Sequence, residues 1–201
     1  MWISVAATVF ALMIPAELPD KTFVATLVMA TRFRALPVLI GAALGFATQA
    51  GIAVAAGSAI ALLPDKPVKA VSAAIFALGA VLMLRTIESP ETEEAEVERE
   101  LASTPAEPSA WRVVGTSFLV LFLAEWGDLT QLLTASLSAK YDNPTAVFTG
   151  SFLGLMAVAG LAVTGGKALL RVMPLNWVRR VAAVAFAAVA VFTALEAAGV
   201  V

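Results

Sequence analysis

Hydrophobic residues occur along this chain in long, nearly unbroken runs, and polar residues gather in the short stretches between the runs. Each run has about 20 residues or more, which is the length that an α-helix needs to cross roughly 30 Å of hydrocarbon. The stretches between them contain proline, aspartate, asparagine or arginine, as turns between helices usually do. The pattern therefore predicts six transmembrane helices. They are expected at residues 2–31, 36–63, 67–87, 111–139, 144–167 and 175–199.

The composition agrees with a protein of the membrane. Hydrophobic residues make up 60% of the 201 residues and charged residues only 14%, whereas a soluble domain has about 45–50% and about 25%. Eight of the 15 acidic residues lie between positions 88 and 107, so the remainder has almost no charge to cover a surface in water. We predict an all-α integral membrane protein. Because the N-terminus lacks a basic segment and a cleavage site, we expect a first helix there and not a removed signal.

The chain contains no histidine and no cysteine. Thiolate nucleophiles, imidazole bases and zinc sites built on histidine or cysteine are therefore excluded. A metal ion must be bound by oxygen atoms, which favours Mg²⁺, Ca²⁺ or Mn²⁺. Proton chemistry must use carboxylates or lysine. We predict no resident cofactor and no partner among nucleic acids.

The two halves of the chain repeat each other. At an offset of 108, residues 8–26 match residues 116–134 at seven of 19 positions. Three helices per half is an odd number, so the halves are expected to insert with opposite orientations, as in many secondary transporters. The fold class that we predict is six transmembrane helices in two inverted three-helix repeats. The repeats are residues 1–87 and 111–201, with an acidic linker at residues 88–110 between them.

Two glycine pairs and one glutamine also attract attention inside the predicted helices. With a further slip of one residue, Gly41-x-x-x-Gly45 corresponds to Gly150-x-x-x-Gly154. Small residues four apart allow helices to approach closely, so we expect these pairs to pack against other helices and not to bind ions. Gln49 either lines a transport pathway or forms an ordinary hydrogen bond between helices.

Four carboxylates interrupt the predicted transmembrane helices: Glu17 and Asp20 in the first, and Glu125 and Asp128 in the fourth. An ionised group at the bilayer centre costs at least roughly 2.5–3.5 kcal/mol, so these acids need a compensating partner. Residues three apart share a helix face, and two inverted motifs would bring all four carboxylates together. A cage of oxygen atoms with excess negative charge suits a hard divalent cation. Neutral oxygen atoms beside the acids are expected from Thr22, Thr130 and Gln131.

The same motifs predict interruptions of the helices that carry them. Pro15 and Pro19 each remove a backbone hydrogen bond in the first helix, and Gly127 occupies the position equivalent to Pro19 in the fourth. Unwound backbone in a membrane is tolerated where it lines a cavity or a site. We therefore expect helices one and four to be broken or kinked at the carboxylates. Lys21 partly offsets the acidic charge there.

The segments AELPDKT (16–22) and AEWGDLT (124–130) resemble the twin E-x-G-D-[KR]-[TS] signatures of the GDT family of cation–proton antiporters for Mn²⁺ and Ca²⁺. The resemblance extends over nearly the whole chain. It departs from the pattern at Pro19, which replaces a glycine, and at Leu129, which replaces a basic residue. The resemblance implies that the metal-binding acids are Glu17, Asp20, Glu125 and Asp128, with Thr22 and Thr130 alongside.

The resemblance further implies a secondary transporter that exports a divalent cation in exchange for protons by alternating access, and not an enzyme. Mn²⁺ is favoured over Ca²⁺ because the chain most resembles the bacterial manganese exporters of the family. A proton-coupled exporter of an organic cation, such as a basic amino acid, is the alternative. An intramembrane aspartyl protease also needs two aspartates, but not four acids in repeated motifs.

Lysine and arginine residues are distributed unevenly between the two ends of the predicted helices. Nine lie on the side of the acidic linker and three on the other side, with Lys21 inside a helix. By the positive-inside rule the linker is cytoplasmic and both termini lie outside an inner (plasma) membrane. The lipid bilayer and the ion are the expected partners, and a homo-oligomer is possible. The linker is expected to be a solvated spacer with some helical tendency, or to concentrate cations at the cytoplasmic mouth.

Overall fold

The fold is described by a computed structural model that covers residues 1–18, 20–85, 90–103, 108–172 and 175–200. Within these ranges the chain is helical and has no strand, in agreement with the predicted all-α class. The helices are α1 (Trp2–Glu17), α2 (Lys21–Arg32), α3 (Ala35–Ile60), α4 (Asp65–Arg85), α5 (Pro90–Glu100), α6 (Ala110–Ala124), α7 (Leu129–Tyr141), α8 (Pro144–Val172) and α9 (Leu175–Ala198), with a short 3-10 turn at Leu101–Ser103.

Three stretches of helix are long and apolar enough to cross a membrane. The number rises to as many as five if each bent pair of helices is counted as one transmembrane stretch. The three stretches are Ala35–Ile60, Pro144–Gly165 and Arg180–Ala198. The predicted helix at 67–87 coincides with α4 as far as Arg85, and its last two residues lie outside the described part of the chain. The described residues therefore support an integral membrane protein with three to five candidate transmembrane helices.

Helices one and four of the prediction are each broken into two. The axes of α1 and α2 differ by 73°, and so do those of α6 and α7. The first helix runs through Pro15 and ends at Glu17, so this proline does not itself interrupt it; Pro19 lies outside the described residues. The second break contains Gly127, whose φ of +76° is a conformation that glycine adopts without strain.

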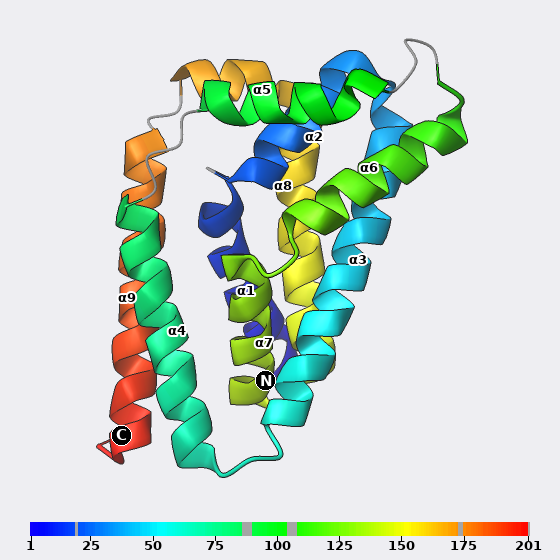
Figure 1. Cartoon of the computed structure of the whole chain (residues 1–201). Helices are drawn as coiled ribbons and strands as arrows, with labels where there is room; N and C mark the ends of the chain where they lie inside the picture. The colour runs from blue at the N-terminus through cyan, green and yellow to red at the C-terminus, as the bar shows by residue number, and fades with distance from the viewer. Residues whose placement is uncertain (19, 86–89, 104–107, 173–174, 201) are drawn as a thin grey trace.

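The long helices pack in pairs that join the two halves of the sequence. Helix α1 packs against α8, α3 against α6, and α4 against α9. The short helices follow the same rule, because α2 contacts α8 and α7 contacts α3. In Figure 1 the α4–α9 pair stands to one side, while α1 and α7 lie within the larger group of helices. Neither half forms a separate bundle.

The two glycine pairs lie where α3 packs against α6 and where α8 packs against α1. A Cβ atom on Gly41 would be 2.6 Å from the Cβ of Ser117 in α6, and one on Gly150 would be 2.8 Å from the Cβ of Val9 in α1. Gly154 faces α1 in the same way, against Met13. The expectation that the pairs serve close helix packing is confirmed by these contacts.

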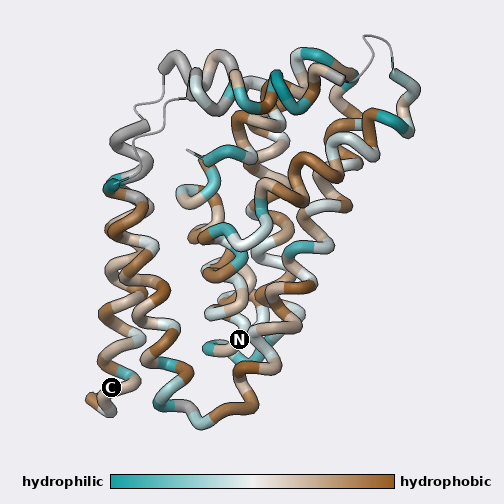
Figure 2. The backbone as a smooth tube through the Cα atoms, viewed as in Figure 1, coloured by the Kyte–Doolittle hydropathy of each residue, from teal (hydrophilic) through white to brown (hydrophobic). Residues whose placement is uncertain are grey.

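One of the two expectations for the acidic linker was a solvated spacer with some helical tendency. The linker does form a helix, but part of it is packed against the rest of the molecule. Its helix α5 lies across one end of the molecule and packs against α2 (Figure 1). Val97 and Leu101 are buried in the core that also contains Phe23 and Phe46. Val97 lies in α5 and Leu101 is the first residue of the 3-10 turn that follows it, while Glu96, Glu98 and Glu100 of α5 are exposed. Figure 2 shows this polar helix beside the mainly hydrophobic long helices.

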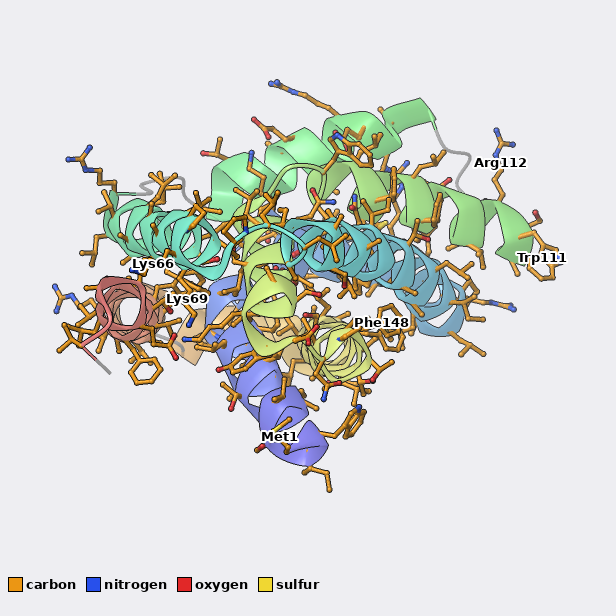
Figure 3. All side chains as sticks on the ribbon, turned by 90° about the horizontal axis from the view of Figure 1, so that it is seen from below. Met1, Lys66, Lys69, Trp111, Arg112 and Phe148 are labelled. Atoms are coloured by element: carbon orange, nitrogen blue, oxygen red, sulfur yellow. The ribbon has the colours of Figure 1, made fainter. Side chains whose placement is uncertain are left out.

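The opposite end of the molecule carries both termini and the connection between α3 and α4 (Figure 1). Seen from that end in Figure 3, Lys66 and Lys69 lie at the start of α4 beside α9, and Trp111 and Arg112 project from the outer end of α6. A partly buried ion pair lies between α7 and α9. Lys140 Nζ is 3.1 Å from Glu196 Oε2 and donates a hydrogen bond to Thr193 Oγ1 at 3.0 Å.

Candidate functional site

In both broken helices, the first segment ends at a buried glutamate, and the break begins there. Glu17 is the last residue of α1 and Glu125 the C-cap of α6, and their exposed fractions are only 1% and 2%. A threonine five residues later donates a hydrogen bond to each carboxylate. Thr22 Oγ1 lies 2.5 Å from Glu17 Oε2, and Thr130 Oγ1 lies 2.8 Å from Glu125 Oε2. The two motifs thus build the same local arrangement.

Carboxylates from both halves meet between these breaks. One oxygen atom from each of Glu17, Glu125 and Asp128 lies within 4.8 Å of the other two, a geometry in which one metal ion can touch all three. Asp128 is also the N-cap of α7, where its Oδ2 accepts a hydrogen bond from the Thr130 amide at 3.2 Å. Asp20 is the N-cap of α2 and is not part of this group of three.

One oxygen atom of each glutamate is left without a hydrogen-bond donor. Glu17 Oε1 and Glu125 Oε1 are both buried and have no partner among the described residues. An unsatisfied buried acceptor costs about 1–3 kcal/mol, and more where the group is charged. Since three acids also share this small volume, their negative charges repel each other. Binding of a cation or of protons would relieve both penalties.

Thr22, Thr130 and Gln131, which are predicted to provide neutral ligand oxygen atoms, all form hydrogen bonds around the two glutamates or the second break. The hydroxyls of Thr22 and Thr130 donate to the glutamates and so determine which carboxylate oxygen is free. Gln131 uses both ends of its amide elsewhere, because it accepts from the Gly127 amide and donates to Gln49. Gln49 thus forms hydrogen bonds between helices, one of the two alternatives predicted for it. Its partner Gln131 could not be predicted, since the two glutamines are 82 residues apart and the only signal was an amide inside an apolar run.

A cavity of about 250 Å³ lies beside the site, between α5 and the two broken helices. Lys21 lines it from α2, Glu96 and Glu100 line it from α5, and Ala124 lines it from the end of α6. Ala124 directly precedes Glu125 in the sequence, and Lys21 directly follows Asp20, but none of the four motif acids itself lines the cavity. Its wall brings together the linker and the first residue of α2, which the sequence alone did not connect.

Comparison with known proteins gives consistent matches. The sequence profile of the family described as "Divalent cation/proton antiporter GDT1" matches residues 5–91 and 113–200. The GDT1-like protein sll0615 of Synechocystis is 34% identical over 161 residues, which is 76% of this chain and 78% of that protein. The "Putative manganese exporter" of Vibrio cholerae is 34% identical over 184 residues, 89% of this chain and 84% of its own. No solved structure matches.

Proposed function

The chain belongs to the GDT1 family of divalent cation/proton antiporters, and we propose that within this family it exports Mn²⁺ in exchange for protons. It is a membrane transporter and not an enzyme. Mn²⁺ is preferred in the proposal because the relative from Vibrio cholerae carries the name of a manganese exporter. Ca²⁺ is the second candidate, since it also takes carboxylate oxygen atoms and differs from Mn²⁺ mainly in size and ligand number.

The transport site that we propose consists of Glu17, Asp20, Glu125 and Asp128. The observation that carries it is the meeting of three of these carboxylates within 4.8 Å, two of them with a buried oxygen atom that has no hydrogen bond. Such oxygen atoms can bind a divalent cation or a proton, but not both at once. Competition for the same atoms is what exchange of the two ions requires.

The proposed architecture is six transmembrane helices in two inverted repeats. The paired contacts of Gly41 with α6 and Gly150 with α1 support it, because they relate the halves at the offsets of 108 and 109 found in the sequence. The two matched segments of the family profile, residues 5–91 and 113–200, support it as well. The proposed repeats are residues 1–87 and 111–201, joined by the linker 88–110.

The proposed orientation puts α5 in the cytoplasm and both termini outside. The excess of lysine and arginine on the side of α5 supports it, and so does the position of both termini at the opposite end of the molecule (Figure 1). Together with Lys21, the four acids carry a charge of −3, so a bound divalent cation leaves −1. We propose that the metal binds from the cytoplasm, that the halves change their relative tilt, and that protons from outside displace it.

Flux measurements on purified protein in liposomes test the proposed function. With a pH gradient that drives protons in the direction opposite to Mn²⁺ export, we expect a Mn²⁺ flux that stops when the gradient is collapsed. The Ca²⁺ flux should be smaller. Lysine and arginine in excess should not compete with Mn²⁺. Flux of Ca²⁺ above that of Mn²⁺ would reverse the ranking of the two ions, and flux of neither ion, or inhibition by the amino acids, would favour the organic-cation alternative.

The acids of the cavity provide a further prediction about how the ion arrives. The double variant Glu96→Gln/Glu100→Gln should lower the initial Mn²⁺ flux roughly two-fold at low ionic strength, because surface charge raises the local concentration of cations. The deficit should disappear at high salt, where the Debye length falls to about 3 Å at 1 M. Glu98→Gln is the matched control, since Glu98 is exposed on the same helix but does not line the cavity. An equal deficit in the control would contradict a role for the cavity.

A further inference from the structure

We infer that Gln49 and Gln131 are positioning residues for the second carboxylate motif, which they hold in shape by bridging the break between α6 and α7. The inference rests on the proposed function, because it assigns a role in ion binding to two residues whose hydrogen bonds go to groups other than the two glutamates. It concerns a contact between α3 and the broken helix, and therefore between the two halves of the chain.

The break leaves backbone groups without their helical partners. In a continuous helix the Phe122 carbonyl would accept from the Trp126 amide, and the Leu123 carbonyl from the Gly127 amide. Instead, the Trp126 amide donates to Leu123 at 3.2 Å. The Phe122 carbonyl and the Gly127 amide thus both lose the bond that a helix would provide. Inside a membrane such groups must be satisfied by other means.

The two glutamine side chains supply the missing partners through one continuous series of hydrogen bonds. Gln49 Nε2 donates to the Phe122 carbonyl at 2.6 Å, Gln131 Nε2 donates to Gln49 Oε1 at 2.5 Å, and the Gly127 amide donates to Gln131 Oε1 at 2.8 Å. The donor-to-acceptor direction of these hydrogen bonds is fixed, because a rotated Gln49 amide would place its oxygen against the Phe122 carbonyl oxygen. Gln49 is 3% exposed, so water does not replace it readily.

The bridge spans the segment that contains Glu125 and ends one residue before Asp128. Glu125 lies between Phe122 and Gly127 in the sequence, and Asp128 follows Gly127 directly. Three hydrogen bonds therefore hold both ends of the segment whose carboxylates face Glu17. Without the bridge, the segment can shift relative to Glu17, and the oxygen atoms no longer converge on one ion.

In the described part of the first motif, the positions equivalent to the two glutamines carry no amide side chain. At the offsets of the repeat, Gln131 corresponds to Phe23 and Gln49 to Val158, and both of these side chains are apolar and buried. Within the described residues, these two equivalent positions therefore cannot form the amide bridge that the second motif has. Its loss should impair binding at one side of the site, and should leave the hydrogen bond between Thr22 and Glu17 in place.

Gln49→Met tests the inference, because methionine has a similar length but no amide. We expect the apparent KM for Mn²⁺ in liposomes to rise on the order of ten-fold, as is common when a group that orients a metal ligand is lost, with a smaller change in the maximal rate. Gln131→Met should have a similar effect, and the double variant should be no worse than either single one. Thr48→Val is the control, since the exposed Thr48 hydroxyl bonds only to its own helix, at the Leu44 carbonyl.

Gln49→Glu distinguishes positioning from a general loss of packing. A protonated glutamic acid presents one donor and one acceptor, as the amide does, whereas an ionised one cannot donate to the Phe122 carbonyl. The flux of this variant relative to wild type should therefore rise as the pH falls, and that of Gln49→Met should stay constant. An unchanged KM in Gln49→Met, or a flat ratio in Gln49→Glu, would overturn the inference.

The same proteins in detergent separate the two proposals. Mn²⁺ should raise the melting temperature of wild type, and a higher Mn²⁺ concentration should be needed for the same rise in Gln49→Met. If wild type transports Mn²⁺ and responds to it, but Gln49→Met does so equally well, the bridge has no positioning role and the proposed function stands. If wild type shows neither flux nor a thermal response to Mn²⁺, the proposed function and the positioning role both fail.

Discussion

Glu125→Gln should abolish proton-driven Mn²⁺ flux, with a rate at least roughly 100-fold below that of wild type, since even the loss of a residue that only orients a ligand costs 10–100-fold. The amide that replaces the carboxylate still accepts the hydrogen bond of Thr130, but it removes one of the three charges that converge within 4.8 Å. It also cannot take up a proton in exchange for the metal. Glu17→Gln should have the same effect, because Glu17 has the same burial and the same type of threonine partner.

Variants at the threonine and on the surface control this result. Thr130→Ser keeps the hydroxyl that donates to Glu125 and should retain most of the flux, whereas Thr130→Val leaves Glu125 Oε2 without this donor and should not. Glu98→Gln removes an exposed acid on α5 and should transport like wild type. Wild-type flux in either glutamate variant, with the protein correctly folded, would mean that the buried carboxylates are not the transport site.

Gly150→Leu should strongly destabilise the protein, while Gly160→Leu on the same helix should be tolerated. A Cβ atom on Gly150 would lie 2.5 Å from the Ala6 carbonyl oxygen and 2.8 Å from the Val9 Cβ, so α1 and α8 must separate to admit any side chain. Among the described residues, no atom outside the adjacent turns of α8 lies within 4 Å of a Cβ on Gly160. Overpacking costs about 1–3 kcal/mol or more, which corresponds to a fall in melting temperature of roughly 2–4 °C per kcal/mol for a chain of this length.

The measurement is the yield of monodisperse protein and its melting temperature in detergent. Gly41→Leu and Gly51→Leu form the corresponding pair on α3, because Gly41 contacts α6 closely and Gly51 faces open space. Equal stability of Gly150→Leu and Gly160→Leu would contradict the close packing of α1 on α8. If the two contacts are equivalent, Gly150→Leu and Gly41→Leu should both destabilise the protein, whereas Gly160→Leu and Gly51→Leu should not.

Several features of the molecule could be predicted because they depend on residues that are near each other in the sequence. The break at Gly127 is one, since a residue that adopts a positive φ without strain lies between two charged positions in an apolar run. The close packing of Gly41 and Gly150 is another, since glycines four apart have few other uses inside apolar helices. The resemblance to the antiporter family depended on the two short motifs around Glu17 and Glu125, and the matches to known proteins confirm it.

Other features could not be predicted, because they join residues that are distant in the sequence. The pair of Lys140 and Glu196 is separated by 56 positions, and the pair of Gln49 and Gln131 by 82. The linker residues Val97 and Leu101 pack into a core formed largely by other helices. In each case the local sequence permits several partners, and only the packing of the helices selects one.

The sequence by itself determined the class of the protein, the ends of most of its helices, the place of the second break and the family to which the chain belongs. These depend on hydrophobic length, on local backbone preference and on motifs of a few residues. Only the tertiary structure decided which carboxylates converge, which of their oxygen atoms lack a partner, and that Gln131 braces the break at Gly127 through Gln49. The physical reason is that a hydrogen bond or a shared ion requires atoms within a few ångströms, and that proximity arises from how α1, α3, α6 and α7 pack and not from their order along the chain.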